Sequence, residues 1–262
     1  MKPGIFNPKM IRRFIRTIFK YTLTSCAIMI ASTNAEAEQI NVMASVAFKE
    51  PYLKMVEQYE KAGHLVKTTW LPTVEIVKRI KAEDSGDLVI IDSRSIDSLI
   101  ALGKLNPDSK VDYVSSGIGI GVAKGANRPV LNDKEDLKKL ILATDSLAYS
   151  TGPSGAYLAG LFERMGIAEQ IKSKTKIIQG EPVGNAVKRG EVQTAFQQIP
   201  EILAVPEIDF VGPLPADIQY VTTFAFATPS SKTTTTAIHE FIKYLKSPDG
   251  VVDLKAHGLE PK

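Results

Sequence analysis

Gly86-Asp-Leu-Val-Ile-Ile91 ends in four consecutive apolar residues, as expected of a strand that is buried on both faces in a parallel sheet. Two other short apolar runs, residues 40–44 and 65–70, precede it. Between the first two runs, apolar residues recur at helical spacing at positions 52, 55, 56 and 59. Strands that alternate with helices in this way predict an α/β fold with mostly parallel sheets.

The second half of the chain continues this alternation. The spacing of apolar residues predicts helices over 134–142, 154–165 and 183–188 and strands over 176–179 and 193–197. An amphipathic helix follows near the C-terminus, with Ala237, Ile238, Phe241, Ile242 and Leu245 on one face. Two extended stretches, 116–123 and 221–227, separate these sets of elements. The pattern therefore predicts two α/β lobes joined by extended crossover segments.

Charge is distributed unevenly along the 262 residues. The formal net charge is +3, from 32 Lys and Arg against 29 Asp and Glu. Six basic residues and one acidic residue lie in the first 37 positions, which leaves −2 for the remainder. A slightly acidic chain does not favour nucleic acid as a partner.

The first 37 residues have the order of a secretory signal. A basic run over 9–20 is followed by the uncharged stretch 21–33 and then by Ala35-Glu-Ala37. We expect cleavage after Ala37 and a location in the periplasm. A membrane anchor is the rival interpretation, but a spanning helix needs about 20 apolar residues and this stretch is shorter. Lipidation of Cys26, which follows Leu23-Thr-Ser25, is the alternative. Cys26 is the one cysteine of the sequence, so the processed chain would form no disulfide of its own.

Small and polar residues follow several predicted strands at the points where helices begin. These turns are Ser45-Val-Ala-Phe-Lys-Glu-Pro51, Pro72-Thr73, Ser150-Thr-Gly-Pro-Ser-Gly155 and Gly180-Glu-Pro-Val-Gly-Asn185. Helix N-termini offer unpaired N–H groups and a positive dipole end, so together the turns predict a site for a small anion or polar molecule. The simpler alternative at each turn is a helix cap, with Thr73 as the N-cap of its helix.

Other motifs are incomplete. Gly117-Ile-Gly-Ile-Gly121 lacks the spacing of a nucleotide-binding loop and is better interpreted as a crossover strand with a close backbone approach. Gly152-Pro-Ser-Gly-Ala156 resembles the nucleophile elbow of a serine hydrolase, but alanine replaces its second glycine. His64, His239 and His257 share no motif with an acid or a serine, and the sequence contains no metal-ligand spacing. We therefore predict no metal and no cofactor.

Taken in order, several motifs of the chain resemble those of the periplasmic solute-binding proteins of ABC importers, in particular the molybdate-binding group. They are Ile40-Asn-Val-Met-Ala-Ser45, Pro72-Thr-Val-Glu-Ile-Val-Lys-Arg-Ile80, Gly86-Asp-Leu-Val-Ile90, Gly152-Pro-Ser-Gly-Ala-Tyr157 and Glu181-Pro-Val-Gly-Asn-Ala-Val-Lys-Arg-Gly-Glu191. The resemblance implies a two-lobed, type II periplasmic binding protein fold. Lobe 1 would comprise 38–115 and 224–262, and lobe 2 would comprise 116–223.

The resemblance also implies a function. The protein would not be an enzyme but a monomeric binding protein, which holds a molybdate- or tungstate-like oxyanion between the lobes and delivers it to a membrane permease. Carried over by position, Thr73 supplies a hydroxyl, whereas Ser154 and Val183 supply backbone N–H groups. Ala47, with Ser45 nearby, and Gln197 stand where the family has a ligating serine and tyrosine. These two departures keep open a different small anion such as an organic acid; a serine hydrolase using Ser154 is the remaining alternative.

Overall fold

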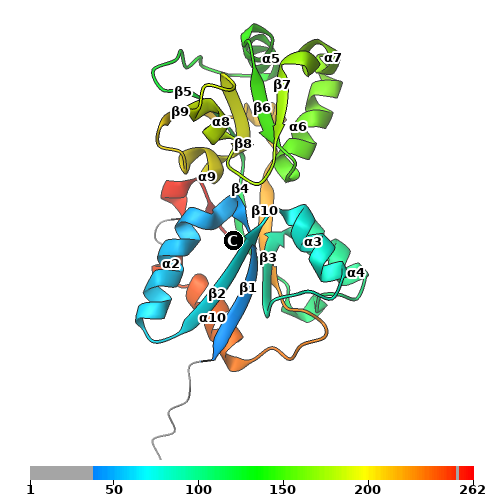
Figure 1. Cartoon of the computed structure of the whole chain (residues 1–262), viewed down its shortest axis with the longest axis vertical. Helices are drawn as coiled ribbons and strands as arrows, with labels where there is room; N and C mark the ends of the chain where they lie inside the picture. Colours follow the sequence, from blue (N-terminus) through cyan, green and yellow to red (C-terminus); the bar gives the residue numbers. More distant parts are fainter. Residues whose placement is uncertain (1–37, 252–253) are drawn as a thin grey trace, which may run out of the picture. The chain divides into compact units, whose positions relative to one another are not determined.

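The computed structural model describes residues 38–251 and 254–262, and the strands in this part of the chain form two sheets (Figure 1). The predicted export signal, its cleavage site and Cys26 lie outside the described residues. In the described part, no helix has both the length and the apolar character needed to cross a membrane.

The first sheet has the strand order β11-β4-β10-β3-β1-β2. Its strands are β1 (Gln39–Ser45), β2 (Leu65–Leu71), β3 (Leu88–Asp92), β4 (Val111–Ser116), β10 (Thr222–Ala227) and β11 (Glu260–Pro261). β1 pairs in parallel with β2 and β3, whereas β10 is antiparallel to both β3 and β4.

The second sheet has the order β7-β6-β8-β5-β9. Its strands are β5 (Ile118–Ala123), β6 (Leu147–Ser150), β7 (Thr175–Ile178), β8 (Thr194–Gln198) and β9 (Ile208–Pro213). β6 pairs in parallel with β7 and β8, and β5 is antiparallel to β8 and β9. The predicted α/β class is confirmed, but both sheets are mixed rather than mostly parallel, because β5 and β10 run against the neighbours they join.

Helices cover both faces of each sheet. The longer ones are α2 (Lys49–Lys61), α3 (Thr73–Lys81), α4 (Ser93–Ala101), α5 (Lys134–Ala143), α6 (Pro153–Arg164) and α10 (Thr236–Leu245). Shorter ones are α7 (Ala168–Ile171), α8 (Gly184–Lys188), α9 (Ile199–Leu203) and α11 (Pro248–Val251), with 3-10 turns that include η1 (Val46–Phe48) and η5 (Lys255–His257).

The apolar run in β3 shows how the first sheet is buried. Leu88 and Ile90 pack in the core that contains residues of α2 and α10, and Val89 and Ile91 pack on the opposite face with residues of α3 and α4. In the second sheet, α5, α6 and α7 cover one face, whereas α8 and α9 cover the other. The four apolar residues of the run are therefore all buried, as the sequence predicted.

Two connections join the sheets. Gly117 stands between the end of β4 and the start of β5, and the chain returns from β9 to β10 through residues 214–221. The stretch around Gly119 and Gly121 is a strand, as expected. A Cβ at these two positions would lie 2.8 Å from a side-chain carbon of Phe210 and of Ile208 respectively, so the glycines make room for side chains of β9 rather than for another backbone. The lobe boundaries given above remain a prediction.

Gly155 shapes the turn between β6 and α6. A Cβ there would lie 1.5 Å from the carbonyl oxygen of Ser150, whereas at Gly160 in the same helix it would meet only the end of the Arg164 side chain, at 3.2 Å. We expect Gly155→Ala to lower the free energy of unfolding by about 1–3 kcal/mol through overpacking. The control, Gly160→Ala, should raise it by about 0.5–1 kcal/mol. Urea denaturation of both variants measures this, and a Gly155→Ala protein as stable as the wild type would contradict the expected close contact.

Candidate functional site

The predicted turns come together at a cavity of about 40 Å³, named here the central cavity. It lies where strands of both sheets end and the following helices begin. The residues that line it include five of the six predicted site residues, which are Ser45, Ala47, Thr73, Ser154 and Gln197. The sixth, Val183, does not line it in the described structure. A volume of about 40 Å³ holds roughly three water molecules, so it admits one small charged group.

Two further cavities adjoin the central cavity and share residues with it. One, of about 440 Å³, shares Thr73, Thr151, Gly152 and Pro153 and also has Asp92, Arg94 and Tyr220 in its lining. The other, of about 140 Å³, shares residues that include Ala47 and Glu201 and adds Lys49 and Glu50. We name them the Arg94 cavity and the Lys49 cavity, and the three cavities together the cleft.

Thr73 has an unpaired hydroxyl in this cleft. It is the first residue of α3, whose N-cap is Pro72, so the expectation that Thr73 is the N-cap is wrong. Since Thr73 stands one position after the N-cap, its hydroxyl does not cap the helix, and Pro72 has no side-chain donor or acceptor to do so. Thr73 is buried and its Oγ1 has no hydrogen-bond partner in the described structure. A buried polar group without a partner is costly, so this oxygen is suited to meet a ligand atom.

The hydroxyl of Ser45 is partly used within the protein. Ser45 is the N-cap of η1, and its Oγ accepts the backbone N–H of Ala47 at 3.4 Å. Both residues are buried and line the central cavity. The bond is long and therefore weak, so the N–H of Ala47 and the hydroxyl of Ser45 both keep capacity for a further contact.

Ser154 occupies the first turn of α6. The helix has Gly152 as its N-cap, without a side-chain bond, and Pro153 as its first residue. Ser154 is fully buried and lines the central cavity. Proline suits this position because a first-turn N–H has no helical partner to lose, and the N–H groups that follow it point out of the helix end.

Gln197 and Val183, the two remaining predicted residues, are hydrogen-bonded to each other. Its Oε1 accepts the backbone N–H of Val183 at 2.6 Å, and its Nε2 donates to Oε1 of Glu201 at 2.6 Å. The N–H of Val183, predicted to bind the ligand, is therefore bonded inside the protein. Gln197 likewise uses both ends of its amide within the protein, although it lines the central cavity.

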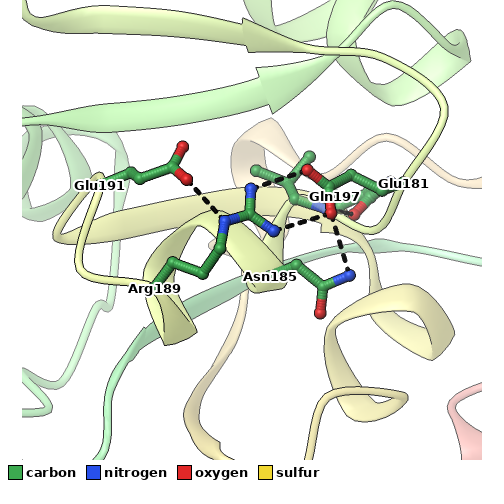
Figure 2. Close-up of polar contacts among 6 residues, drawn as sticks. Glu181, Asn185, Arg189, Glu191 and Gln197 are labelled. Atoms are coloured by element: carbon green, nitrogen blue, oxygen red, sulfur yellow. Dashed lines mark hydrogen bonds and ion pairs between the residues drawn. The ribbon is translucent and has the colours of Figure 1, made fainter.

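Arg189 lies beside this network and is bound to carboxylates (Figure 2). It donates to both oxygens of Glu181, at 2.7 and 2.9 Å, and its Nε donates to Glu191 at 2.5 Å. These bonds lower the pKa of Glu181 and keep it ionised. Among the described residues that line the central cavity there is no lysine and no arginine. An anion there would thus depend on neutral donors.

Glu201, at the start of α9, is the site residue that the sequence analysis missed. It lines the central cavity and the Lys49 cavity and is only 7% exposed. Burial raises the pKa of its carboxyl to about 8. The signal was present in the sequence, since Gln197-Gln-Ile-Pro-Glu201 is one more strand followed by a proline-initiated helix. The described residues that line the cleft include no histidine that would serve a hydrolase using Ser154.

Comparison with known proteins identifies the class. Residues 40–260 match the family model described as bacterial extracellular solute-binding protein, and the chain belongs to this family. Among curated proteins, an aconitate isomerase from a Pseudomonas species is 33% identical over 251 residues, which cover 92% of this chain and 96% of that protein.

Solved structures support the fold. The periplasmic molybdate-binding protein of Azotobacter vinelandii superposes with a TM-score of 0.69 at 16% identity, covering 84% of this chain and 98% of that one. The sulfate-binding protein SubI of Mycobacterium tuberculosis gives 0.67 at 18% identity, covering 85% and 86%. The predicted two-lobed binding-protein fold and the predicted resemblance are confirmed.

The unpaired hydroxyl of Thr73 leads to a stability test on the ligand-free protein. Thr73→Val removes a buried hydroxyl that has no partner, so we expect the free energy of unfolding to rise by about 1 kcal/mol. Thr228→Val is the matched control, because Thr228 is also buried but its Oγ1 is hydrogen-bonded to Thr234 at 3.1 Å. That variant should lose about 1 kcal/mol. If denaturation shows Thr73→Val to be the less stable of the two, the hydroxyl of Thr73 has a partner inside the protein.

Proposed function

We propose that the chain binds a small anion in the cleft through neutral donors. The observation that carries this proposal is the buried, unpaired hydroxyl of Thr73 at the start of α3. Ser154 and the first turn of α6 lie across the same cavity, and both helices are long enough to present a positive dipole end. Ser45 and Ala47 supply a further hydroxyl and N–H. A group with several acceptor oxygens satisfies these donors better than water does.

We propose further that the anion is a carboxylate rather than a molybdate-like oxyanion. The solved molybdate- and sulfate-binding proteins are under 20% identical and bear on the fold alone. The relative at 33% identity acts, by its name, on aconitate, a small unsaturated tricarboxylic acid. The cleft is consistent with such an anion, because one carboxylate fills the central cavity while the others extend towards Arg94 and Lys49. Molybdate and tungstate remain the comparison ligands.

Export and delivery complete this proposal. The basic run, apolar stretch and Ala35-Glu-Ala37 favour a signal that is removed in the periplasm, and the family described above is extracellular. We propose that the processed, monomeric chain closes its two lobes on the anion by a hinge motion near Ser115 and Phe224 and hands it to the permease of an ABC importer.

Isomerisation of the bound acid is the second candidate function. It is favoured by the aconitate isomerase, which this chain matches over 96% of that protein's length, and by Glu201, a carboxyl in the cleft that exchanges a proton near neutral pH. Moving a double bond along an unsaturated acid requires one C–H bond to break and another to form. A group that accepts and returns a proton is therefore needed, and the reaction consumes no other reagent.

The ligand class is tested by a thermal-shift panel. We expect cis- and trans-aconitate to raise the melting temperature more than molybdate, tungstate, sulfate or phosphate, because only a ligand that binds the folded state stabilises it. Thr73→Val should weaken the response, with affinity lowered by about tenfold through the loss of one hydrogen bond to a charged group. A response to molybdate or tungstate alone would overturn the carboxylate assignment.

Isomerisation is tested by proton NMR. We expect the chain to convert cis-aconitate into a mixture with trans-aconitate, and heat-denatured protein to leave it unchanged. The Thr73→Val variant should convert it more slowly at low substrate concentration, because less substrate is bound. A protein that binds aconitate in the thermal-shift panel yet leaves the ratio of isomers constant is a binding protein only.

A further inference from the structure

Glu201 is an acid inside a site for an anion. It follows β8 directly, and α9 presents it to the central cavity and the Lys49 cavity. An ionised carboxylate at this place would repel an anionic ligand, and the central cavity holds no lysine or arginine among its described lining residues to offset that repulsion.

The hydrogen bond to Gln197 fixes the role of one oxygen of Glu201. A backbone N–H only donates, so the bond from Val183 makes Oε1 of Gln197 an acceptor and orients its amide nitrogen towards Glu201. That nitrogen donates to Oε1 of Glu201, which is therefore an acceptor. When the carboxyl is protonated, the proton resides on Oε2, the oxygen not bonded to Gln197.

The charges around Glu201 do not hold it ionised. Lys49, Glu50 and Glu181 line cavities that it shares, and Arg189 is bound to Glu181. The elements packed against α9 carry Asp209 on β9 and Lys255 and His257 on η5. No ion pair joins Glu201 to these lysines or to Arg189 in the described residues, and burial is the cause that raises its pKa to about 8.

We propose that Glu201 meets the bound anion as a carboxylic acid and donates a hydrogen bond to it through Oε2, so that the anion and one proton bind together. This inference rests on the proposed anion site. Protonation removes a negative charge from beside the ligand and adds a donor in a cavity that otherwise offers hydroxyl and N–H groups.

The proton is measured by isothermal titration calorimetry with trans-aconitate in buffers of different ionisation enthalpy. Near pH 7 the free protein already carries the proton, so we expect almost no uptake on binding. At about pH 9 the free carboxyl is ionised, and uptake should approach one proton per anion. The affinity should fall by up to tenfold per pH unit above about 8.

Two glutamine variants separate Glu201 from its neighbours. Glu201→Gln keeps an oxygen that accepts from Gln197 and an amide that donates to the anion, but it cannot ionise, so binding should persist without proton uptake or this pH dependence. Glu181→Gln is the matched control, because Glu181 lines the same cavity as a carboxylate bound to Arg189. Its pH dependence of binding should remain that of the wild type.

Stability gives a measurement that needs no ligand. Glu201 is protonated in the folded protein up to about pH 8 but ionised above about pH 4.3 when unfolded. Its contribution to stability is therefore greatest below pH 4.3 and is lost as the pH rises towards 8, with the unfolding constant rising by up to tenfold per pH unit. Glu201→Gln should remove this slope from the wild-type profile.

The outcomes are distinguishable. Binding of trans-aconitate at pH 7 with no proton uptake at about pH 9, or a pH dependence that persists in Glu201→Gln, overturns the role of Glu201 and leaves the anion site standing. Absence of binding at pH 7 by the wild type overturns the carboxylate function itself, and the proposed role of Glu201 with it.

Discussion

Parallel strand pairing is the constraint on which the candidate site depends. β1 lies in parallel between β2 and β3, and β6 lies in parallel between β7 and β8. Parallel strands must end at the same edge of their sheet, so the turns that follow them are brought side by side. In the first sheet, Ser45 at the end of β1 and Thr73 after β2 come together for this reason, and in the second sheet Ser154 after β6 and Glu201 after β8 do so. All four residues line the central cavity. The antiparallel strands β5 and β10 connect the two sheets without interrupting these parallel groups.

Among the described residues that line the centre of the cleft, no fixed charge is left unpaired. Arg189 is bound to Glu181 and Glu191, and Gln197 is bound to Val183 and Glu201. What remains for a ligand at the centre is a set of hydroxyl and N–H donors with one buried acid. Charged side chains lie at the two ends, where Arg94 and Asp92 line one adjoining cavity and Lys49 and Glu50 line the other.

Much of the fold was predictable because it depends on local patterns. The apolar run in β3, the helical spacing in α2 and the glycine-rich strand β5 were all expected from the sequence. Strand direction was not, because the period of side chains along a strand is the same in parallel and antiparallel pairs. Four strands were not predicted. They are β4, the four-residue strand β6, β9, whose Gly212 and Pro213 are atypical of a strand, and the two-residue strand β11.

The sequence by itself determined the α/β class, the order of the elements and the strand-to-helix turns that carry Ser45, Thr73 and Ser154, because these follow from residues close together in the chain. Only the tertiary structure decided how the polar groups are used. It left the hydroxyl of Thr73 unpaired, bonded the N–H of Val183 to Gln197 and buried Glu201. Hydrogen bonding and desolvation depend on which distant residues fold together, and no local pattern encodes them.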